Sequence, residues 1–242
     1  MGLRVAIKLG GGLITDKGSM KKFDQKAVER VVGSLSSVSE LGASIILVHG
    51  AGSFGHLLAK KWGIANGLNI HQEEEQVEAV REIRSDMREL NALIIGKMEE
   101  RGLECIGYPP SDWARGTGAL FTGDVSIFER SSSQPIPVTF CDVVHTEDES
   151  RFGILSGDDL MLRLSTELEV THSIFLIGDS EGVLTGPPDE DGSELITHLG
   201  PNTKINRRHE VDIDVTGGIG LKIDRALEIA KLVGEVWIID GR

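Results

Sequence analysis

The chain has 242 residues, of which 40% are hydrophobic and 26% charged, a composition typical of a folded globular protein. Its formal net charge is −13, from 25 basic and 38 acidic residues, which argues against sequence-independent nucleic-acid binding because that binding needs surplus lysine and arginine. No apolar run approaches the ~20 residues of a transmembrane helix, so we expect no membrane partner.

The first half of the chain alternates strand and helix patterns. The stretch 44–48 (SIILV) is a continuous apolar run, the pattern of a strand that is covered on both faces. Apolar residues spaced three or four apart mark the helices on either side of it. The predicted elements are a strand at 3–9, a helix at 24–41, a strand at 44–48, a helix at 73–101 and a strand at 103–108.

The second half continues the alternation after a stretch at 116–137 that is rich in glycine and serine, where we predict loops or hairpins. Strands that alternate with helices indicate a mainly parallel sheet with helices on both faces, a three-layer α/β/α sandwich. We expect one domain, 1–242, with approximate lobes at 1–170 and 171–242. The predicted elements are strands at 136–140 and 153–155, a helix at 160–168, a strand at 173–177, a helix at 221–232 and a strand at 236–239.

The chain start and the cysteines bear on location and on metal binding. The segment 1–13 lacks the basic region and long apolar stretch of a signal peptide, so we expect a cytoplasmic location. Cys105 and Cys141 are too few for a disulfide framework or a zinc site. We interpret both as small buried residues and expect no protein metal site.

Three glycine-rich turns follow predicted strands or precede predicted helices: 10–12 (GGG), 49–56 (HGAGSFGH) and 214–220 (DVTGGIG). Glycine lets backbone N–H groups approach phosphate oxygens because no Cβ intervenes. A turn that opens into a helix also directs the positive end of the helix dipole at an anion. Three such turns in one α/β chain predict a polyphosphate and a second anion held together.

One competing interpretation is a nicotinamide-dependent enzyme, because 50–55 matches the dinucleotide-binding pattern G-x-G-x-x-G after a strand. That fold places an acidic residue at the end of the next strand, about 20 residues on, to hold the ribose. The acids in the corresponding stretch here form a polar run, 73–75, at the start of a helix. We therefore disfavour this class, and the absence of GxxxxGK[ST] excludes a P-loop kinase.

Three lysines accompany the turns. Lys8 ends the first strand, and a lysine buried there is costly without an anion. Lys17 follows the first turn in the unit KLGGGLITDK, and Lys222 begins a helix, where the helix dipole disfavours a cation unless a phosphate is present. Phosphoryl transfer depends on positioning the reactants and on neutralising the charge of the moving group. Lysines and backbone N–H groups can do both.

Five motifs occur in the order KLGGGLITDK, HGAGSFGH, LSGDDL, GDSEGV and DVTGGIGLK. In this order the chain resembles the amino acid kinase superfamily from Lys8 to about Asp240. Within the superfamily, ITDK and SFGH make it similar to the isopentenyl phosphate kinases. The resemblance implies a carbamate kinase-like fold, an acceptor lobe at 1–170 and a nucleotide lobe at 171–242, with ATP as co-substrate and isopentenyl phosphate as acceptor.

The resemblance also implies roles for individual residues. Lys8 would bridge ATP phosphates, Lys17 would stabilise the transferring phosphoryl group, and His56 would donate to the acceptor phosphate. Asp158 and Asp159 would hold the acceptor and orient the lysines, Asp159 as a catalytic residue. The implied acceptor set is Ala51, Gly52, Ser53, His56, Gly157 and Asp158. The implied ATP set is Lys8, Gly10, Gly11, Gly12, Gly52, Asp179, Gly182, Gly218 and Lys222.

Structural roles remain open for several of these positions. His56 could be a core or helix-start histidine, and one of Asp158 and Asp159 is expected to cap the helix that follows. The remaining histidines, His49 among them, are interpreted as ordinary. The helical stripe Val77, Val80, Ile83 and Met87 is a candidate slot for the isoprenoid tail, although most of such a stripe is normally core.

Other functions stay open beside phosphorylation of isopentenyl phosphate to the diphosphate. The acceptor could be another small phosphate or a phosphonate such as fosfomycin, whereas a carboxylate acceptor gives no special use for His56. A nucleotide-binding protein that had lost the chemistry should have lost Lys8, Lys17 or Lys222, and all three are present. Mg²⁺ would bridge the ATP phosphates with little protein ligation, and a homodimer is implied by resemblance alone.

Overall fold

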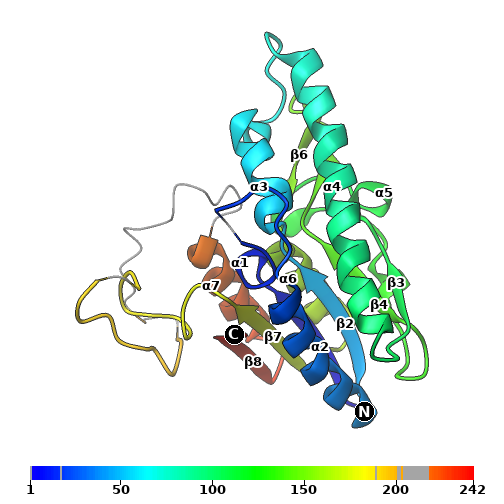
Figure 1. The fold of residues 1–242 in the computed structure, drawn as a ribbon, viewed down its shortest axis with the longest axis vertical. Helices are drawn as coiled ribbons and strands as arrows, with labels where there is room; N and C mark the ends of the chain where they lie inside the picture. Colours follow the sequence, from blue (N-terminus) through cyan, green and yellow to red (C-terminus); the bar gives the residue numbers. More distant parts are fainter. Residues whose placement is uncertain (1, 17, 189, 201–202, 204–217) are drawn as a thin grey trace.

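The computed structural model describes residues 2–16, 18–188, 190–200, 203 and 218–242 (Figure 1). Its centre is a six-stranded sheet with the order β3-β4-β2-β1-β7-β8, and every neighbouring pair of strands is parallel. The strands are β1 (Arg4–Leu9), β2 (Ser44–His49), β3 (Cys105–Gly107), β4 (Ile136–Phe140), β7 (His172–Ile177) and β8 (Glu235–Asp240).

Helices cover both faces of this sheet. On one face α2 (Gln25–Glu40) and α4 (Glu73–Glu99) share a core cluster with residues of β1, β2 and β4. On the other face α6 (Gly157–Glu167) and α7 (Gly218–Ile229) share a second cluster with β1, β2 and β7. The predicted three-layer α/β/α sandwich around a mainly parallel sheet is therefore confirmed.

Local sequence signals explain where α2 begins and ends. The Asp24 carboxylate accepts a hydrogen bond from the Ala27 N–H (2.9 Å) and so caps the first turn. Val28, Val31 and Leu35 recur on one face and are buried. The helix ends just before Gly42, whose φ of 78° suits glycine and terminates the helical path.

The start of α6 differs from the sequence prediction. The helix begins at Gly157, three residues before the predicted start, because Ser156 caps it: the Ser156 hydroxyl accepts from the Asp159 N–H at 3.1 Å. The expectation that Asp158 or Asp159 caps this helix is thus wrong. The Ser156 hydroxyl also donates to Oδ2 of Asp159 at 3.1 Å.

Other short elements are also absent from the sequence prediction. The second glycine turn continues at once into the helix α3, because packing on α4 overrides the low helix propensity of its glycines. Only one strand of the antiparallel hairpin β5–β6 was predicted, and the predicted loop stretch at 116–137 contains two 3₁₀ helices. The bounds are α1 (Gly11–Ile14), α3 (Gly52–Lys61), η1 (Ile64–Asn66), α5 (Pro110–Trp113), η2 (Gly118–Leu120), η3 (Val125–Phe128), β5 (Asp142–His145) and β6 (Phe152–Leu155).

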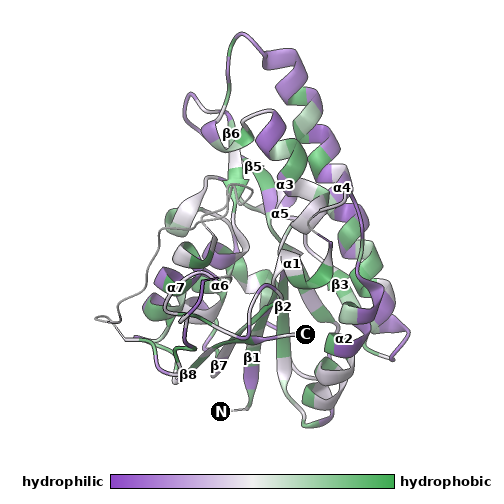
Figure 2. Cartoon of the chain, turned by 60° about the vertical axis from the view of Figure 1, so that its left-hand side comes forward, coloured by the Kyte–Doolittle hydropathy of each residue, from purple (hydrophilic) through white to green (hydrophobic). Residues whose placement is uncertain are grey.

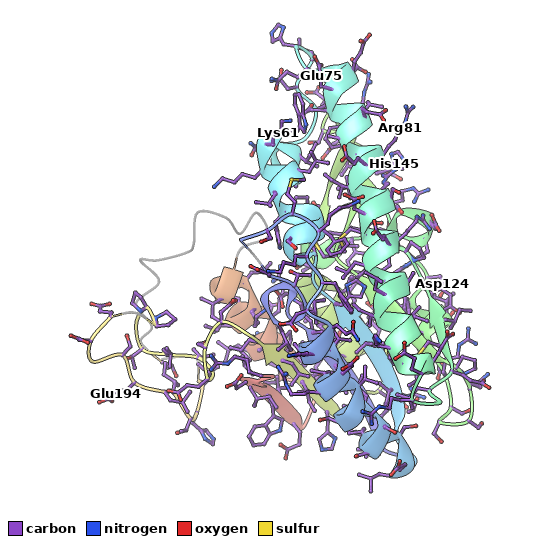
Figure 3. All side chains as sticks on the ribbon, viewed as in Figure 1. Lys61, Glu75, Arg81, Asp124, His145 and Glu194 are labelled. Carbon is purple, nitrogen blue, oxygen red and sulfur yellow. The ribbon has the colours of Figure 1, made fainter. Side chains whose placement is uncertain are left out.

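Charge lies on the outer surface of the helices. Figure 2 shows hydrophilic and hydrophobic segments alternating along α4, as expected for a helix with one face on the core. The side chains of Lys61 and Arg81 point outward from α3 and α4 (Figure 3). Among the described residues, no helix is both long enough and apolar enough to span a membrane.

Candidate active site

The first two glycine turns lie against each other at the carboxyl ends of β1 and β2. A Cβ atom on Gly11 would lie 2.4 Å from the backbone nitrogen of Gly52, closer than any real contact. Gly52 itself has a φ of 49°, in the left-handed region that favours glycine. Only glycine at these two positions allows the turns to interlock. In parallel α/β sheets this edge is where ligands bind.

Thr15 joins the two turns. Its hydroxyl donates to the Gly11 carbonyl at 2.8 Å and accepts from the Ser53 N–H at 2.9 Å. The Ser53 hydroxyl in turn accepts from the Lys22 N–H at 3.2 Å. The Ser53 backbone N–H, expected beside the acceptor, therefore has a protein partner in this arrangement. Thr15 was not predicted as a site residue, although its place directly after the first turn is a usable signal.

Two lysines meet one carboxylate beside the interlocked turns. Lys8 Nζ lies 2.5 Å and Lys222 Nζ 3.1 Å from the same oxygen, Oδ1 of Asp158. All three side chains are largely buried, with 4–11% of each exposed. Two cations on one buried carboxylate leave a net positive charge, so the cluster suits an anion.

Burial and charge shift the pKa values of this cluster. Burial, assisted by the nearby charge of Lys222, lowers the pKa of Lys8 to about 8 against the opposing effect of Asp158. Burial alone would raise the pKa of Asp158, but Lys222 and Lys8 outweigh it and the pKa is lowered. The carboxylate stays ionised at neutral pH, and Lys8 releases its proton far more readily than a surface lysine.

Gly157 makes room for Lys8. A Cβ atom on Gly157 would lie 2.9 Å from Cε of Lys8. The lysine stem therefore crosses the first turn of α6 at Gly157, where any larger residue would make the end of the Lys8 side chain shift. The predicted pairing of a Gly-Asp-Asp unit with the first-strand lysine thus has a direct steric basis.

Asp159 has a different partner from Asp158. Its Oδ1 accepts from Nε of Arg225 on α7 at 2.7 Å, and Arg225 also pairs with Glu228 at 3.1 Å. Asp158 contacts both lysines, whereas Asp159 links α6 to α7. Arg225 was not predicted as a site residue, although it follows Lys222 by three positions and so shares its helix face.

His56 lies on α3 and is partly buried. The preceding residue, Gly55, packs against α4: a Cβ atom there would lie 3.3 Å from Sδ of Met87 and 3.9 Å from Cγ2 of Ile83. Met87, Ile83 and Val80 are buried in the core cluster that also contains Phe54. The structure thus brings the predicted tail stripe to the turn of α3 that carries His56.

The residues predicted to hold ATP lie at the ends of β1 and β7. Gly10 donates its N–H to the Leu176 carbonyl at 2.8 Å, and a Cβ on Gly178 would lie 2.5 Å from Cα of Leu13. The loop after β7 therefore packs on the first glycine turn. This arrangement places Gly12, Asp179 and Gly182 along adjoining segments, and Gly218 begins α7.

Part of the predicted site lies outside the described residues. Lys17 is one such residue, and positions 214–217 of the third glycine turn are others. Within the described ranges, no group of three histidine, cysteine or carboxylate side chains is arranged to hold a metal ion. Asp158 and Asp159 are both engaged by protein cations.

Interlocked glycine turns, a buried pair of lysines and the carboxyl edge of a parallel sheet are features typical of α/β proteins that bind phosphate groups. The amino acid kinase family model matches residues 3–240, so the chain belongs to the amino acid kinase family. The carbamate kinase of Giardia lamblia bound to AMP-PNP shares the fold, with a TM-score of 0.65 and 10% identity over 99% of this chain and 93% of that one.

Relatives at 27–29% identity include several isopentenyl phosphate kinases. The chain is 29% identical to the isopentenyl phosphate kinase of Thermoplasma acidophilum, covering 97% of this chain and 91% of the relative. It is 27% identical to the isopentenyl phosphate kinase of Arabidopsis thaliana, covering 98% and 87%. A crystal structure of an isopentenyl phosphate kinase substrate complex matches with a TM-score of 0.81 and 26% identity, covering 100% and 92%.

Proposed function

We propose that this chain transfers the γ-phosphoryl group of ATP to isopentenyl phosphate, giving ADP and isopentenyl diphosphate. The observation that carries the proposal is the buried cluster of Lys8, Asp158 and Lys222 beside two interlocked glycine turns. The cluster supplies excess positive charge, and the turns supply backbone N–H groups, so two phosphate groups can be held together. The isopentenyl phosphate kinases among its relatives identify the acceptor.

The chemistry requires little from the protein beyond position and charge. An oxygen of the acceptor monophosphate attacks the γ-phosphorus, the bond to the β,γ-bridging oxygen breaks, and ADP leaves with that electron pair. The attacking oxygen is already anionic, so no strong general base is needed. Catalysis then consists of holding the two anions in line and neutralising the charge on the moving group.

The proposed roles of Lys8, Lys222 and Asp158 rest on the ion pairs that these residues make, whereas those of His56 and Lys17 rest on the resemblance of their motifs. Lys8 and Lys222 bind ATP phosphates, and Asp158 fixes their side chains against a shared oxygen before the nucleotide arrives. His56 donates to the acceptor phosphate at the start of α3. Lys17 stabilises the transferring phosphoryl group.

Mg²⁺ is proposed to enter as part of the nucleotide substrate. Mg²⁺ usually keeps several water ligands and binds through substrate phosphates with one or two carboxylates. Asp158 and Asp159 are already paired with Lys8 and Arg225 in this structure. The ion would therefore neutralise the β- and γ-phosphates while the protein holds the nucleotide through its lysines and glycine turns.

The isoprenoid tail is proposed to lie between α3 and α4. Met87 and Ile83 contact the helix turn of His56, so a phosphate held by His56 would direct its hydrocarbon tail at these side chains, with Val80 one turn further on. An apolar tail is stabilised there by about 0.8 kcal/mol for each buried CH₂ group.

The test is a coupled ADP-release assay with Mg·ATP and a panel of acceptors: isopentenyl phosphate, dimethylallyl phosphate, fosfomycin, UMP, acetylglutamate and buffer alone. We expect a strong preference for isopentenyl phosphate. Preference for another acceptor would support the kinase chemistry and contradict isopentenyl phosphate as the acceptor. No ADP release with any of the acceptors would contradict the proposal that the chain is a kinase. Omission of Mg²⁺ should abolish turnover.

Three broader features complete the proposal. We expect a cytoplasmic homodimer, with residues 1–170 as the acceptor lobe and 171–242 as the nucleotide lobe. Light scattering after size-exclusion chromatography measures the assembly directly, because the chain has a mass of 26.2 kDa and a dimer twice that. A mass equal to one chain at micromolar concentration would reject the dimer.

A further inference from the structure

His49 ends β2 and directly precedes the second glycine turn. Its side chain is fully buried, with 0% exposed, and it stacks on Phe140 of β4 with ring centroids 5.0 Å apart. No sequence pattern distinguishes it from the other histidines. A buried imidazole, however, needs a partner for each ring nitrogen, and the partners of His49 are specific.

One partner is the carbonyl of the glycine that begins the turn. Nδ1 of His49 lies 3.0 Å from the Gly50 carbonyl oxygen, and because a carbonyl only accepts, Nδ1 carries the proton. Nε2 lies 3.3 Å from Oδ1 of the Asn91 amide on α4. A half-turn of the Asn91 amide group exchanges its oxygen and its nitrogen. When Nδ1 of His49 carries the proton, Nε2 accepts a hydrogen bond from the Asn91 amide nitrogen in that orientation.

The ring is neutral at physiological pH. Burial lowers the pKa of His49 to about 4, although its hydrogen bonds to Gly50 and Asn91 act in the opposite direction. A neutral imidazole carries a single proton. That proton forms the hydrogen bond to the Gly50 carbonyl.

Gly50 is consequently held at both of its backbone polar groups. Its N–H donates to the Leu9 carbonyl at 2.8 Å, and its C=O accepts from His49. In a planar trans peptide the C=O and the next N–H point in opposite directions. The N–H of Ala51 therefore points away from the His49 ring.

The register of the strands shows toward which face of the sheet the Ala51 N–H points. Lys8 is paired with Val48, and Leu9 is paired with His49. Successive strand residues face opposite sides, so His49 and Lys8 lie on opposite faces of the sheet. The Ala51 N–H is thus directed toward the face that carries Lys8 and the start of α6.

We propose that His49 is a positioning residue for the acceptor: it holds the Gly50–Ala51 peptide with its carbonyl turned away from the acceptor phosphate and the Ala51 N–H turned toward it. This inference rests on the proposed function, in which the second turn binds that phosphate. If the peptide turned over, a carbonyl oxygen would face the anion and repel it. The loss of one hydrogen bond to a charged group corresponds to roughly a 10- to 100-fold loss of affinity.

Two amide variants of His49 test where the hydrogen-bond donor to the Gly50 carbonyl must lie. In His49→Asn the amide nitrogen can occupy the place of Nδ1, whereas in His49→Gln it reaches only the place of Nε2. We expect His49→Gln to raise the KM for isopentenyl phosphate about 10- to 100-fold and to leave the KM for Mg·ATP within about twofold. His49→Asn should recover most of the acceptor KM.

Ile94→Ala is the control for lost stability, because Ile94 is fully buried on α4, one helical turn after Asn91. It should lower the melting temperature and leave both KM values unchanged. Equal acceptor KM values for the Gln and Asn variants, or a matching rise in the KM for Mg·ATP, would overturn the inference.

A second measurement does not depend on the substrate or on any variant. Two-bond ¹H–¹⁵N correlation spectra of the labelled wild-type protein report which nitrogen of His49 is protonated, and we expect Nδ1 near neutral pH. Protonation at Nε2 would overturn the inference even if the protein phosphorylates isopentenyl phosphate. If the acceptor panel instead identifies another phosphorylated substrate, the same comparison of KM values is made with that substrate.

Discussion

Lys8 combines two requirements that conflict. To bind phosphate it must be charged, yet burial and the neighbouring Lys222 favour its neutral form and lower its pKa to about 8. Asp158 offsets this effect by ion pairing at 2.5 Å. In the proposed mechanism, activity at neutral pH therefore depends on the Asp158 carboxylate, and this dependence can be measured.

We expect kcat/KM for ATP to fall as the pH rises through about 8, because the free enzyme then loses the Lys8 proton. Asp158 raises the pKa of Lys8, so Asp158→Asn should move this alkaline limb to lower pH. Asp159→Asn is the matched control, since Asp159 pairs with Arg225 instead. A limb that stays in place in Asp158→Asn would exclude Lys8 as its source.

We expect substitution of Lys17 to affect the chemical step and to spare ATP binding, in which Lys8 is proposed to act. The proposed role of Lys17 is confined to the transferring phosphoryl group, so Lys17→Ala should lower kcat by about two orders of magnitude or more, the scale of losing one charge-stabilising donor. ATP affinity, measured by calorimetric titration, should hardly change because Lys8 and Lys222 remain. Unchanged turnover would remove Lys17 from the mechanism.

His56 should act on the other substrate. His56→Ala removes the proposed donor to the acceptor phosphate and should raise the KM for isopentenyl phosphate roughly 10- to 100-fold, with the KM for Mg·ATP preserved. Steady-state kinetics with each substrate varied in turn provides the measurement. If kcat and both KM values match the wild type, the alternative of a structural helix-start histidine is correct.

At the scale of elements, the interlock between the first two glycine turns would set the spacing of the proposed phosphate sites. Gly11→Ala places a Cβ 2.4 Å from the backbone of Gly52 and should destabilise the fold by about 1–3 kcal/mol while abolishing activity. Gly33→Ala, on α2 with no atom near the added Cβ, should stabilise it by about 0.4–1 kcal/mol. Denaturant unfolding of both variants is the measurement, and equal behaviour would contradict the interlock.

The elements also show how far sequence patterns reach. Long periodic helices and continuous apolar strands were predicted within a few residues, because burial on one or two faces leaves a local signature. α3 and β5 were missed, since glycine-rich and short segments take their structure from what they pack against. No pattern within their own short segments predicts α3 or β5.

The same limit applies to the site. Lys8, Asp158 and Lys222 follow from motifs, whereas the joining role of Thr15 depends on a contact between two distant turns. Lys21 is a further case: it pairs at 2.6 Å with Asp86, a buried carboxylate on α4 that lies 65 positions along the chain (86 − 21). No spacing rule predicts such a partner, because tertiary packing creates it.

For the whole molecule, the two proposed lobes share one sheet. β1 pairs with β2 of the acceptor lobe and with β7 of the nucleotide lobe, and Lys222 is tied across the boundary to Asp158. Separating the lobes would expose the edges of β1 and β7 and leave Asp158 with fewer partners. One of the two core clusters is shared between the lobes, because it joins α6 of the acceptor lobe to β7 and α7 of the nucleotide lobe.

We therefore expect scanning calorimetry to show a single unfolding transition for 1–242, with the calorimetric enthalpy equal to the van't Hoff enthalpy. Mg·ATP should raise the whole transition together, by about 2.7 kcal/mol of stability at a concentration 100 times its Kd. Lys222→Met should weaken this effect of the nucleotide without splitting the transition, because β7 remains paired with β1. Two resolved transitions, with only one of them moved by Mg·ATP, would instead show that the lobes fold independently and that the shared sheet does not couple them.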